Sequence, residues 1–163
     1  MLYNRHWRRT KFDIIRENST NEKINLLYLN FTIRARRGDT MKKYTVAVVG
    51  ATGLVGQAII DCLIERDFPV GAMRLLASER SVGQSLLVGD ETVVVEALRP
   101  ESFAGVDIAL FSAGGSVSEV YAPIAAQAGA IVIDNTSFFR MHDTVPLVVP
   151  EVNPDAMTQH QGI

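Results

Sequence analysis

The fold is decided by the stretch Tyr44-Thr45-Val46-Ala47-Val48-Val49-Gly50-Ala51-Thr52-Gly53-Leu54-Val55-Gly56. Its β-branched residues predict a buried strand, and three glycines follow at the spacing G-x-x-G-x-x-G, which predicts a sharp turn into a helix. At such a junction free backbone N–H groups and the positive end of the helix dipole converge, so an anion can bind there. We expect Gly50 to let the chain turn, Gly53 to let a pyrophosphate approach the backbone, and Gly56 to let the helix pack closely on the strand. The alternative is a tight strand-to-helix turn that binds nothing.

The residues after this turn have the pattern of an amphipathic helix. The run 57–68 is apolar at helical spacing, and Pro69 and Gly71 predict that the helix ends near Asp67. The face that we expect this helix to bury comprises Leu54, Val55, Ala58, Ile59, Cys62 and Leu63.

Composition describes one soluble globular domain. The 163 residues are 47% hydrophobic with a net charge of -2, and no run of apolar residues is long enough for a membrane span. The single cysteine, Cys62, excludes an internal disulfide framework and a multi-cysteine metal site, so we expect no metal and a reducing, cytoplasmic location. On its helix Cys62 is expected to be packed core rather than a nucleophile.

Residues 1–40 differ in kind from the remainder. They contain nine Lys/Arg against four Asp/Glu, whereas residues 41–163 contain seven against fourteen. We interpret 1–40 as a basic leader of doubtful structure, upstream of a functional start at Met41, and 41–163 as the domain. A basic nucleic-acid-binding arm is the main alternative, but no recognised motif supports it. The acidic residues in the leader argue against a transit peptide.

Beyond residue 68 the chain alternates between strand and helix patterns. Strands are predicted over 73–77, 85–88, 92–97, 106–111 and 130–133, a turn or short helix at 99–101, and a helix over 117–128 that contains Pro123 and ends at Gly129. The runs 85–88 and 92–97 are expected to form a hairpin. Alternating segments imply right-handed crossovers, so the predicted fold class is α/β, a Rossmann-like doubly wound and mostly parallel sheet.

Three loops fall at the carboxyl ends of predicted strands, where such sheets bind ligands. They are 50–56, 78–81 and 112–115. Their joint placement on one rim predicts dinucleotide binding. The loop 112–115 would lie beside the nicotinamide half; alternatively it is an ordinary loop with Ser116 or Ser118 as the helix cap.

The loop 78–81 is placed to meet the adenosine ribose. Arg80, between Ser78 and Ser81, suits the 2′-phosphate of NADP because a guanidinium binds phosphate in a planar fork. Glu79 is counter-evidence, since an acid here would favour NAD, unless it faces water. Arg80 could also be a solvated loop residue.

Five motifs together carry a family resemblance. They are Gly50-Ala51-Thr52-Gly53-Leu54-Val55-Gly56, Ala77-Ser78-Glu79-Arg80-Ser81-Val82-Gly83, Ser112-Ala113-Gly114-Gly115, Asp134-Asn135-Thr136-Ser137-Phe138-Phe139-Arg140-Met141 and Val145-Pro146-Leu147-Val148-Val149-Pro150-Glu151-Val152-Asn153. From Met41 to its end the chain resembles the aspartate-semialdehyde dehydrogenase family.

The resemblance implies an NADP-dependent enzyme that interconverts aspartyl 4-phosphate and aspartate semialdehyde on the route to lysine, methionine and threonine. It implies a homodimer or homotetramer for the full-length enzyme, with small-molecule substrates and no nucleic-acid or membrane partner. The residues expected to bind the cofactor are Gly50, Thr52, Gly53, Leu54, Val55, Gly56, Ser78, Arg80, Ser81, Ser112, Ala113, Gly114 and Gly115; Arg140 and Asn135 are expected to bind substrate or phosphate. Arg140 could instead be a surface or helix-end arginine.

The family's catalytic cysteine and histidine have no counterpart in this chain. The cysteine follows shortly after a Gly-Ile pair in the family, and this sequence ends at Gly162-Ile163. His142 and His160 do not occupy the position of the catalytic histidine. The chain therefore resembles the cofactor domain without the second, catalytic and dimerisation domain, and we expect no dehydrogenase activity from it alone.

Two rivals stay open. The related N-acetyl-glutamyl-phosphate reductase group shares the cofactor fold, but the motif 134–141 argues against it. A non-catalytic or regulatory NADP-binding protein is the other alternative, although the presence of Asn135 and Arg140 favours descent from a working enzyme.

Overall fold

The computed structural model describes residues 42–163. The expected basic leader over 1–40 and the start at Met41 lie outside the described residues. Among residues 42–163, neither α-helix combines the length and apolar content needed to cross a membrane.

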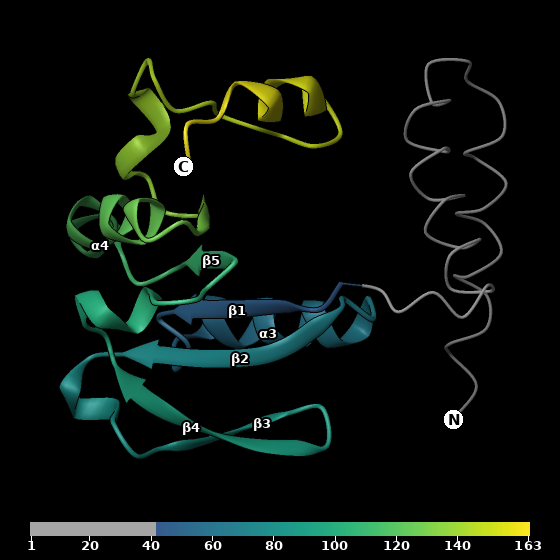
Figure 1. Cartoon of the computed structure of the whole chain (residues 1–163), viewed down its shortest axis with the longest axis vertical. Helices are drawn as coiled ribbons and strands as arrows, with labels where there is room; N and C mark the ends of the chain where they lie inside the picture. The colour runs from purple at the N-terminus through teal and green to yellow at the C-terminus, as the bar shows by residue number, and fades with distance from the viewer. Residues whose placement is uncertain (1–41) are drawn as a thin grey trace, which may run out of the picture. The chain divides into compact units, whose positions relative to one another are not determined.

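Six strands and two α-helices, joined by short 3-10 helices, make up the described part of the chain (Figure 1). In order they are β1 (Tyr44–Val49), α3 (Leu54–Glu65), β2 (Val70–Ala77), β3 (Ser85–Val88), β4 (Glu91–Ala97), β5 (Ile108–Phe111), α4 (Gly115–Gln127) and β6 (Ile131–Asp134), with 3-10 helices at Glu79–Ser81, Pro100–Phe103, Phe138–Met141 and Pro154–Gln159.

The strands form one sheet in the order β3-β4-β2-β1-β5-β6. Every neighbouring pair is parallel except the hairpin β3–β4. Since the chain runs from β1 to β2 on one side and later adds β5 on the other, the order reverses at β1. This arrangement confirms the predicted Rossmann-like, mostly parallel sheet, and it makes the carboxyl end of β1 the topological switch point.

Alternate residues of the central strands enter two hydrophobic clusters on opposite faces of the sheet. Val49 and Phe111 belong to one cluster, together with Ala122 and Ala125 of α4, whereas Val48 belongs to the other. The second cluster includes Ile60 of α3, and Figure 1 shows α3 behind β1 and β2. The sheet is therefore covered by a helix on each face.

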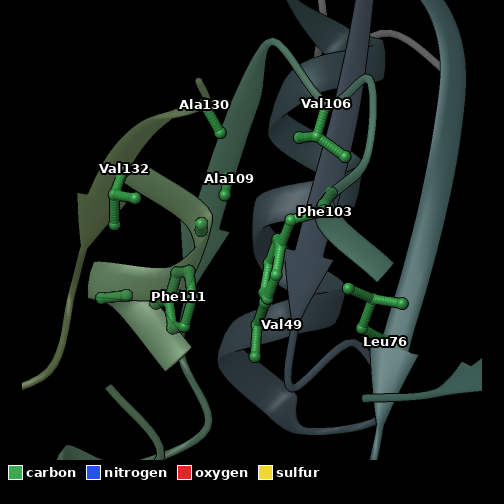
Figure 2. Close-up of a cluster of buried hydrophobic side chains, with 11 residues drawn as sticks. Val49, Leu76, Phe103, Val106, Ala109, Phe111, Ala130 and Val132 are labelled. Carbon is green, nitrogen blue, oxygen red and sulfur yellow. The ribbon is translucent and has the colours of Figure 1, made fainter. Parts of the chain in front are cut away.

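The core on the α4 side is built around two phenylalanines (Figure 2). The rings of Phe103 and Phe111 stack with centroids 6.0 Å apart, and neither residue is exposed. Small residues on α4 let the helix approach them: Ala122 and Ala125 are fully buried. This packing fixes the carboxyl end of β5, from which the loop 112–115 departs.

Several predicted boundaries were displaced. β2 begins at Val70 rather than at residue 73, because its first residues pair with β1, and Gly71 lies inside the strand instead of ending the helix. β5 begins at residue 108 rather than 106, and α4 begins at 115 rather than 117. Pro123 lies inside α4, as predicted.

The prediction of the buried face of α3 was largely wrong. The buried residues of this helix are Gly56 and Ile60, one turn apart. Leu54 is 89% exposed, and Val55, Ala58 and Cys62 are exposed as well. Gly56 lies directly against the backbone of Gly50 and Ala51, so the side of α3 that contains Gly56 and Ile60 faces inward. Cys62 is consequently not packed core.

Candidate functional site

The glycine loop between β1 and α3 has the expected turn. Gly50 has φ of +89°, and its amide and that of Ala51 both donate to the Leu76 carbonyl oxygen, at 2.8 and 3.2 Å. A Cβ added to Gly56 would collide with the Gly50 carbonyl oxygen, so only glycine lets α3 start this close to β1. The turning role of Gly50 and the packing role of Gly56 are thus confirmed.

The start of α3 is left without a side-chain cap. Gly53 occupies the N-cap position in extended conformation, and the first turn contains no acidic residue. The nearest side-chain bond runs from Gln57 Nε2 to the Thr52 carbonyl oxygen at 3.2 Å, which fixes the loop without covering the helix end. Uncapped N–H groups at a helix start, with no carboxylate beside them, favour an anion.

The second loop, 112–115, contacts the glycine loop directly. A Cβ added to Gly50 would lie 2.9 Å from the Ala113 backbone nitrogen. Ser112 holds this loop on the end of β1, since its amide and its Oγ both donate to the Val49 carbonyl oxygen, at 2.9 and 3.1 Å. The two loops therefore form one continuous edge at the switch point.

The alternative that Ser116 or Ser118 caps α4 was wrong. Gly114, with φ of +100°, is the N-cap residue and makes no side-chain cap bond. Ser118 is fully buried, and its Oγ donates to Asp134 Oδ1 at 3.0 Å. Like α3, α4 thus begins at a glycine without a capping side chain.

The third loop, after β2, is joined to the glycine loop through hydroxyl groups. Thr52 Oγ1 and Ser81 Oγ lie 3.4 Å apart. Arg80 is exposed, and no hydrogen-bond or ion-pair partner for it exists among residues 42–163. Its guanidinium is therefore available to a ligand at this end of the rim.

Glu79 has a partner rather than facing only water. Its Oε1 accepts a hydrogen bond from Arg99 Nη2 at 2.9 Å, and the two form an ion pair. The counter-evidence to NADP binding is thereby weakened, because the carboxylate beside Arg80 is already neutralised by a different arginine.

A polar network organises the segment after β6. Asp134 Oδ1 accepts from Ser118 Oγ at 3.0 Å and from the Thr136 amide at 2.8 Å, and its Oδ2 accepts from Thr136 Oγ1 at 2.8 Å. The Asn135 amide donates to the Phe111 carbonyl oxygen at 3.0 Å, which continues the pairing of β6 with β5. Asn135 is thus held beside the start of the loop 112–115.

Arg140 folds back onto this segment. Its Nε donates to the Thr136 carbonyl oxygen at 3.1 Å and its Nη2 to the Asn135 carbonyl oxygen at 3.3 Å, while the side chain stays exposed. Phe138 in the same 3-10 helix lies against Gly115, at 3.6 Å from a Cβ added there. The guanidinium is therefore oriented by two carbonyl groups next to the loop at the start of α4.

The two histidines among the described residues are engaged with neighbours of their own. His142 packs against Phe138 and Phe139, with ring centroids 5.2 Å from each, and His160 Nδ1 accepts from the Gly162 amide. Among the described residues no cluster of His, Cys, Asp or Glu could hold a metal ion.

Sequence reasoning missed four residues that shape the site: Arg99, Ser118, Asp134 and Thr136. Asp134 and Thr136 carried a signal, since an Asp two residues before a Thr at the end of a strand is a common way to form a side-chain turn. Ser118 carried a weaker one, a hydroxyl on a helix face otherwise built of alanines. Arg99 carried none, because its partner is distant in sequence.

Comparison with known proteins agrees with this geometry. The family model described as "Semialdehyde dehydrogenase, NAD binding domain" matches residues 45–160. The aspartate-semialdehyde dehydrogenase of Bacillus subtilis is 54% identical over 118 residues, which are 72% of this chain and 34% of that protein.

Two solved structures share the fold. Aspartate semialdehyde dehydrogenase II from Vibrio cholerae, complexed with ASA, superposes with a TM-score of 0.70 at 51% identity, covering 72% of this chain and 39% of that one. The Candida albicans enzyme with NADP gives a TM-score of 0.59 at 31% identity, covering 69% of this chain and 35% of that one.

The chain spans about a third of the length of the curated relatives that it matches. The matched third is the part that contains the glycine loop, the rim and the segment after β6. Because the family model covers most of this chain, we conclude that it belongs to the semialdehyde dehydrogenase family, to its NAD-binding domain.

Proposed function

We propose that residues 42–163 bind NADP as the cofactor-binding part of an aspartate-semialdehyde dehydrogenase. The proposed reaction of the whole enzyme converts aspartyl 4-phosphate and NADPH to aspartate semialdehyde, phosphate and NADP, in the biosynthesis of lysine, threonine and methionine. A cytoplasmic homodimer or homotetramer is the proposed state of that enzyme. The observation that carries the proposal is the contact of Gly50 with Ala113, which joins two uncapped helix starts at the switch point.

The three loops divide the proposed cofactor between them. The first turn of α3 would receive the pyrophosphate, since its N–H groups and the helix dipole favour an anion. Ser78, Arg80 and Ser81 would bind the 2′-phosphate, and the loop 112–115 would lie beside the nicotinamide. The full set comprises Gly50, Thr52, Gly53, Leu54, Val55, Gly56, Ser78, Arg80, Ser81, Ser112, Ala113, Gly114 and Gly115. NADPH, when bound, would supply the hydride and leave as NADP; these residues would bind and orient the dinucleotide.

The segment after β6 would hold the substrate's phosphate. Arg140 is a permanent cation whose Nε and Nη2 are engaged by backbone carbonyls, which leaves Nη1 to face an incoming anion. Asn135 lies on the same segment, fixed through its amide to the end of β5. The Vibrio cholerae relative was solved in complex with ASA and the Candida albicans relative with NADP, which supports these two kinds of ligand for the whole enzyme.

The chain alone is proposed to bind the cofactor without turning over substrate. The family resemblance implies covalent catalysis, in which a cysteine thiolate attacks the substrate carbonyl beside the nicotinamide. The single thiol in this sequence, Cys62, lies on the exposed face of α3, two turns beyond the glycine loop. We therefore propose that Cys62 is not the nucleophile.

Calorimetric titration of the 163-residue chain with NADP and with NAD tests the proposal. We expect NADP to bind more tightly, and Arg80→Gln to weaken NADP about ten- to a hundredfold while leaving NAD unchanged, as for loss of a charge-assisted hydrogen bond. Arg66→Gln is the matched control, because Arg66 is an exposed arginine at the opposite end of α3. Tighter binding of NAD, or no binding of either, would overturn the assignment.

A further inference from the structure

An acid after the second strand of a dinucleotide fold normally selects against NADP. In this chain Glu79 occupies that loop, directly before Arg80. A free carboxylate here would accept bonds from the ribose hydroxyls of NAD and would repel the 2′-phosphate of NADP. Glu79 therefore favours NAD, whereas the adjacent Arg80 favours NADP.

The sheet itself brings a second arginine to Glu79. β2 and β4 run parallel, with Ala77 opposite Ala97, and the Leu98 amide donates to the Ala77 carbonyl oxygen at 2.8 Å. The residues that follow the two strands therefore leave the sheet side by side. This pairing places Arg99 Nη2 2.9 Å from Glu79 Oε1, although twenty residues separate them in sequence.

The main chain at Arg99 is firmly anchored. Its amide donates to Ser102 Oγ at 3.1 Å and its carbonyl oxygen accepts from the Ser102 amide at 3.0 Å. Ser102 is only 9% exposed, and its hydroxyl also donates to the Ala97 carbonyl oxygen at 3.1 Å. Arg74 Nη1 binds the Ser102 carbonyl oxygen at 2.9 Å, so the anchor extends into the sheet.

The ion pair itself contributes little to folding. The side chains of Arg99 and Glu79 are 63% and 71% exposed, and exposed pairs of this kind have small effects on stability. Their consequence is local and electrostatic: Glu79, Arg80 and Arg99 together contribute one carboxylate and two guanidiniums, so these three side chains have a net charge of about +1 at this end of the rim. Without Arg99, Glu79 would cancel Arg80.

From this arrangement we infer that Arg99 is a specificity-determining residue, which sets the preference for NADP over NAD by neutralising Glu79. The inference rests on the proposed function, because it concerns the 2′-phosphate site of the same cofactor. It extends that function to a residue outside the three loops of the rim.

A mutant cycle on the 163-residue chain tests the inference by calorimetry. We expect Arg99→Gln to weaken NADP about three- to tenfold, with less effect at high salt, and to leave NAD unchanged or slightly tighter. Glu79→Gln in the Arg99→Gln background should restore NADP affinity, because the carboxylate is then absent. Arg66→Gln is again the control, and thermal unfolding should show equal stability for all variants.

The outcomes separate the two proposals. If the unmutated chain prefers NADP but Arg99→Gln keeps that preference, or weakens NADP and NAD alike, the inference about Arg99 is wrong and the proposed function stands. If Glu79→Gln fails to restore binding, Arg99 does not act through Glu79, and the inference is again overturned. If the unmutated chain prefers NAD or binds neither, both proposals fail.

Discussion

Gly50 lies so close to Ala113 that a Cβ on Gly50 would stand 2.9 Å from the Ala113 backbone nitrogen. Gly50 begins the turn after β1, and Ala113 follows β5, the strand beside it. The contact is between backbones, so neither residue can relieve a clash by moving a side chain. It therefore couples the geometry of the two loops proposed to hold the two halves of the dinucleotide.

Gly50→Ala should impair both folding and cofactor binding. We expect a loss of about 2 to 5 kcal/mol in the free energy of unfolding, from a strained positive φ together with the displaced Ala113 backbone. Gly105→Ala is the control: it has φ of +72° with open space around it, and should cost only about 1 to 2 kcal/mol. Urea unfolding and NADP titration of both variants measure the difference; equal losses would contradict a role for the loop contact.

At Gly56 the usual helix rule should reverse. Gly→Ala in an exposed helix stabilises by up to about 1 kcal/mol, but a methyl group at Gly56 meets the Gly50 carbonyl oxygen, and we expect destabilisation of about 1 to 3 kcal/mol. The opposite change on the exposed face, Ala58→Gly, should destabilise by about 1 kcal/mol. Thermal or urea unfolding should therefore show a loss of stability for both Gly56→Ala and Ala58→Gly, although one adds a methyl group and the other removes one. A stabilised Gly56→Ala would mean that α3 does not pack as described.

The sequence predicted the fold well where a local signal and the tertiary structure agree. The valine run before Gly50 specified a central strand, and the hairpin 85–88 with 92–97 was found from its turn residues. The buried face of α3 could not be found in this way, because apolar residues surround most of that helix. The inward side is marked by the close contact of Gly56 with the Gly50 carbonyl group and by the burial of Ile60, both of which depend on the tertiary structure.

The candidate site also has a part that the sequence predicted and a part that it could not. Turn and packing roles of Gly50 and Gly56 followed from the spacing of the glycines, since those roles are local. The partner of Glu79 did not follow, because Arg99 reaches it only through the parallel pairing of β2 with β4. Residue pairs made by sheet topology have no signature in a single sequence.

Asp134 should matter more for stability than the serine that it accepts a bond from. Asp134→Ala removes the acceptor of three hydrogen bonds and should cost roughly 2 to 4 kcal/mol. Ser118→Ala removes two, one donated to Asp134 Oδ1 and one accepted from Thr136 Oγ1, and should cost about 1 to 2 kcal/mol because the Thr136 hydroxyl keeps Asp134 Oδ2 as an acceptor. Asp134→Asn keeps the shape and one acceptor and should fall between them. The free energies of unfolding of the three variants, measured in urea, test this order of stabilities. A smaller loss for Asp134→Ala than for Ser118→Ala would contradict the network.

Arg140→Lys should separate phosphate binding from stability. Lysine cannot donate to the carbonyl groups of Asn135 and Thr136 while presenting a planar fork, so we expect about tenfold weaker binding of inorganic phosphate. The free energy of unfolding should change by less than about 0.5 kcal/mol, since the side chain is exposed. Amide chemical shifts over 135–140 during a phosphate titration report the affinity, with Arg66→Lys as control. Unchanged affinity in Arg140→Lys would remove Arg140 from the phosphate site.

Cys62 should react freely without affecting the cofactor. Because the thiol is exposed on α3, iodoacetamide should alkylate it in the folded chain without denaturant, as mass spectrometry can show. NADP affinity should be equal before and after alkylation, and equal in Cys62→Ser, since the glycine loop lies at the other end of the helix. The unmodified chain should also fail to reduce NADP when supplied with aspartate semialdehyde and phosphate. Turnover that alkylation abolishes would instead make Cys62 a nucleophile and would contradict its placement away from the rim.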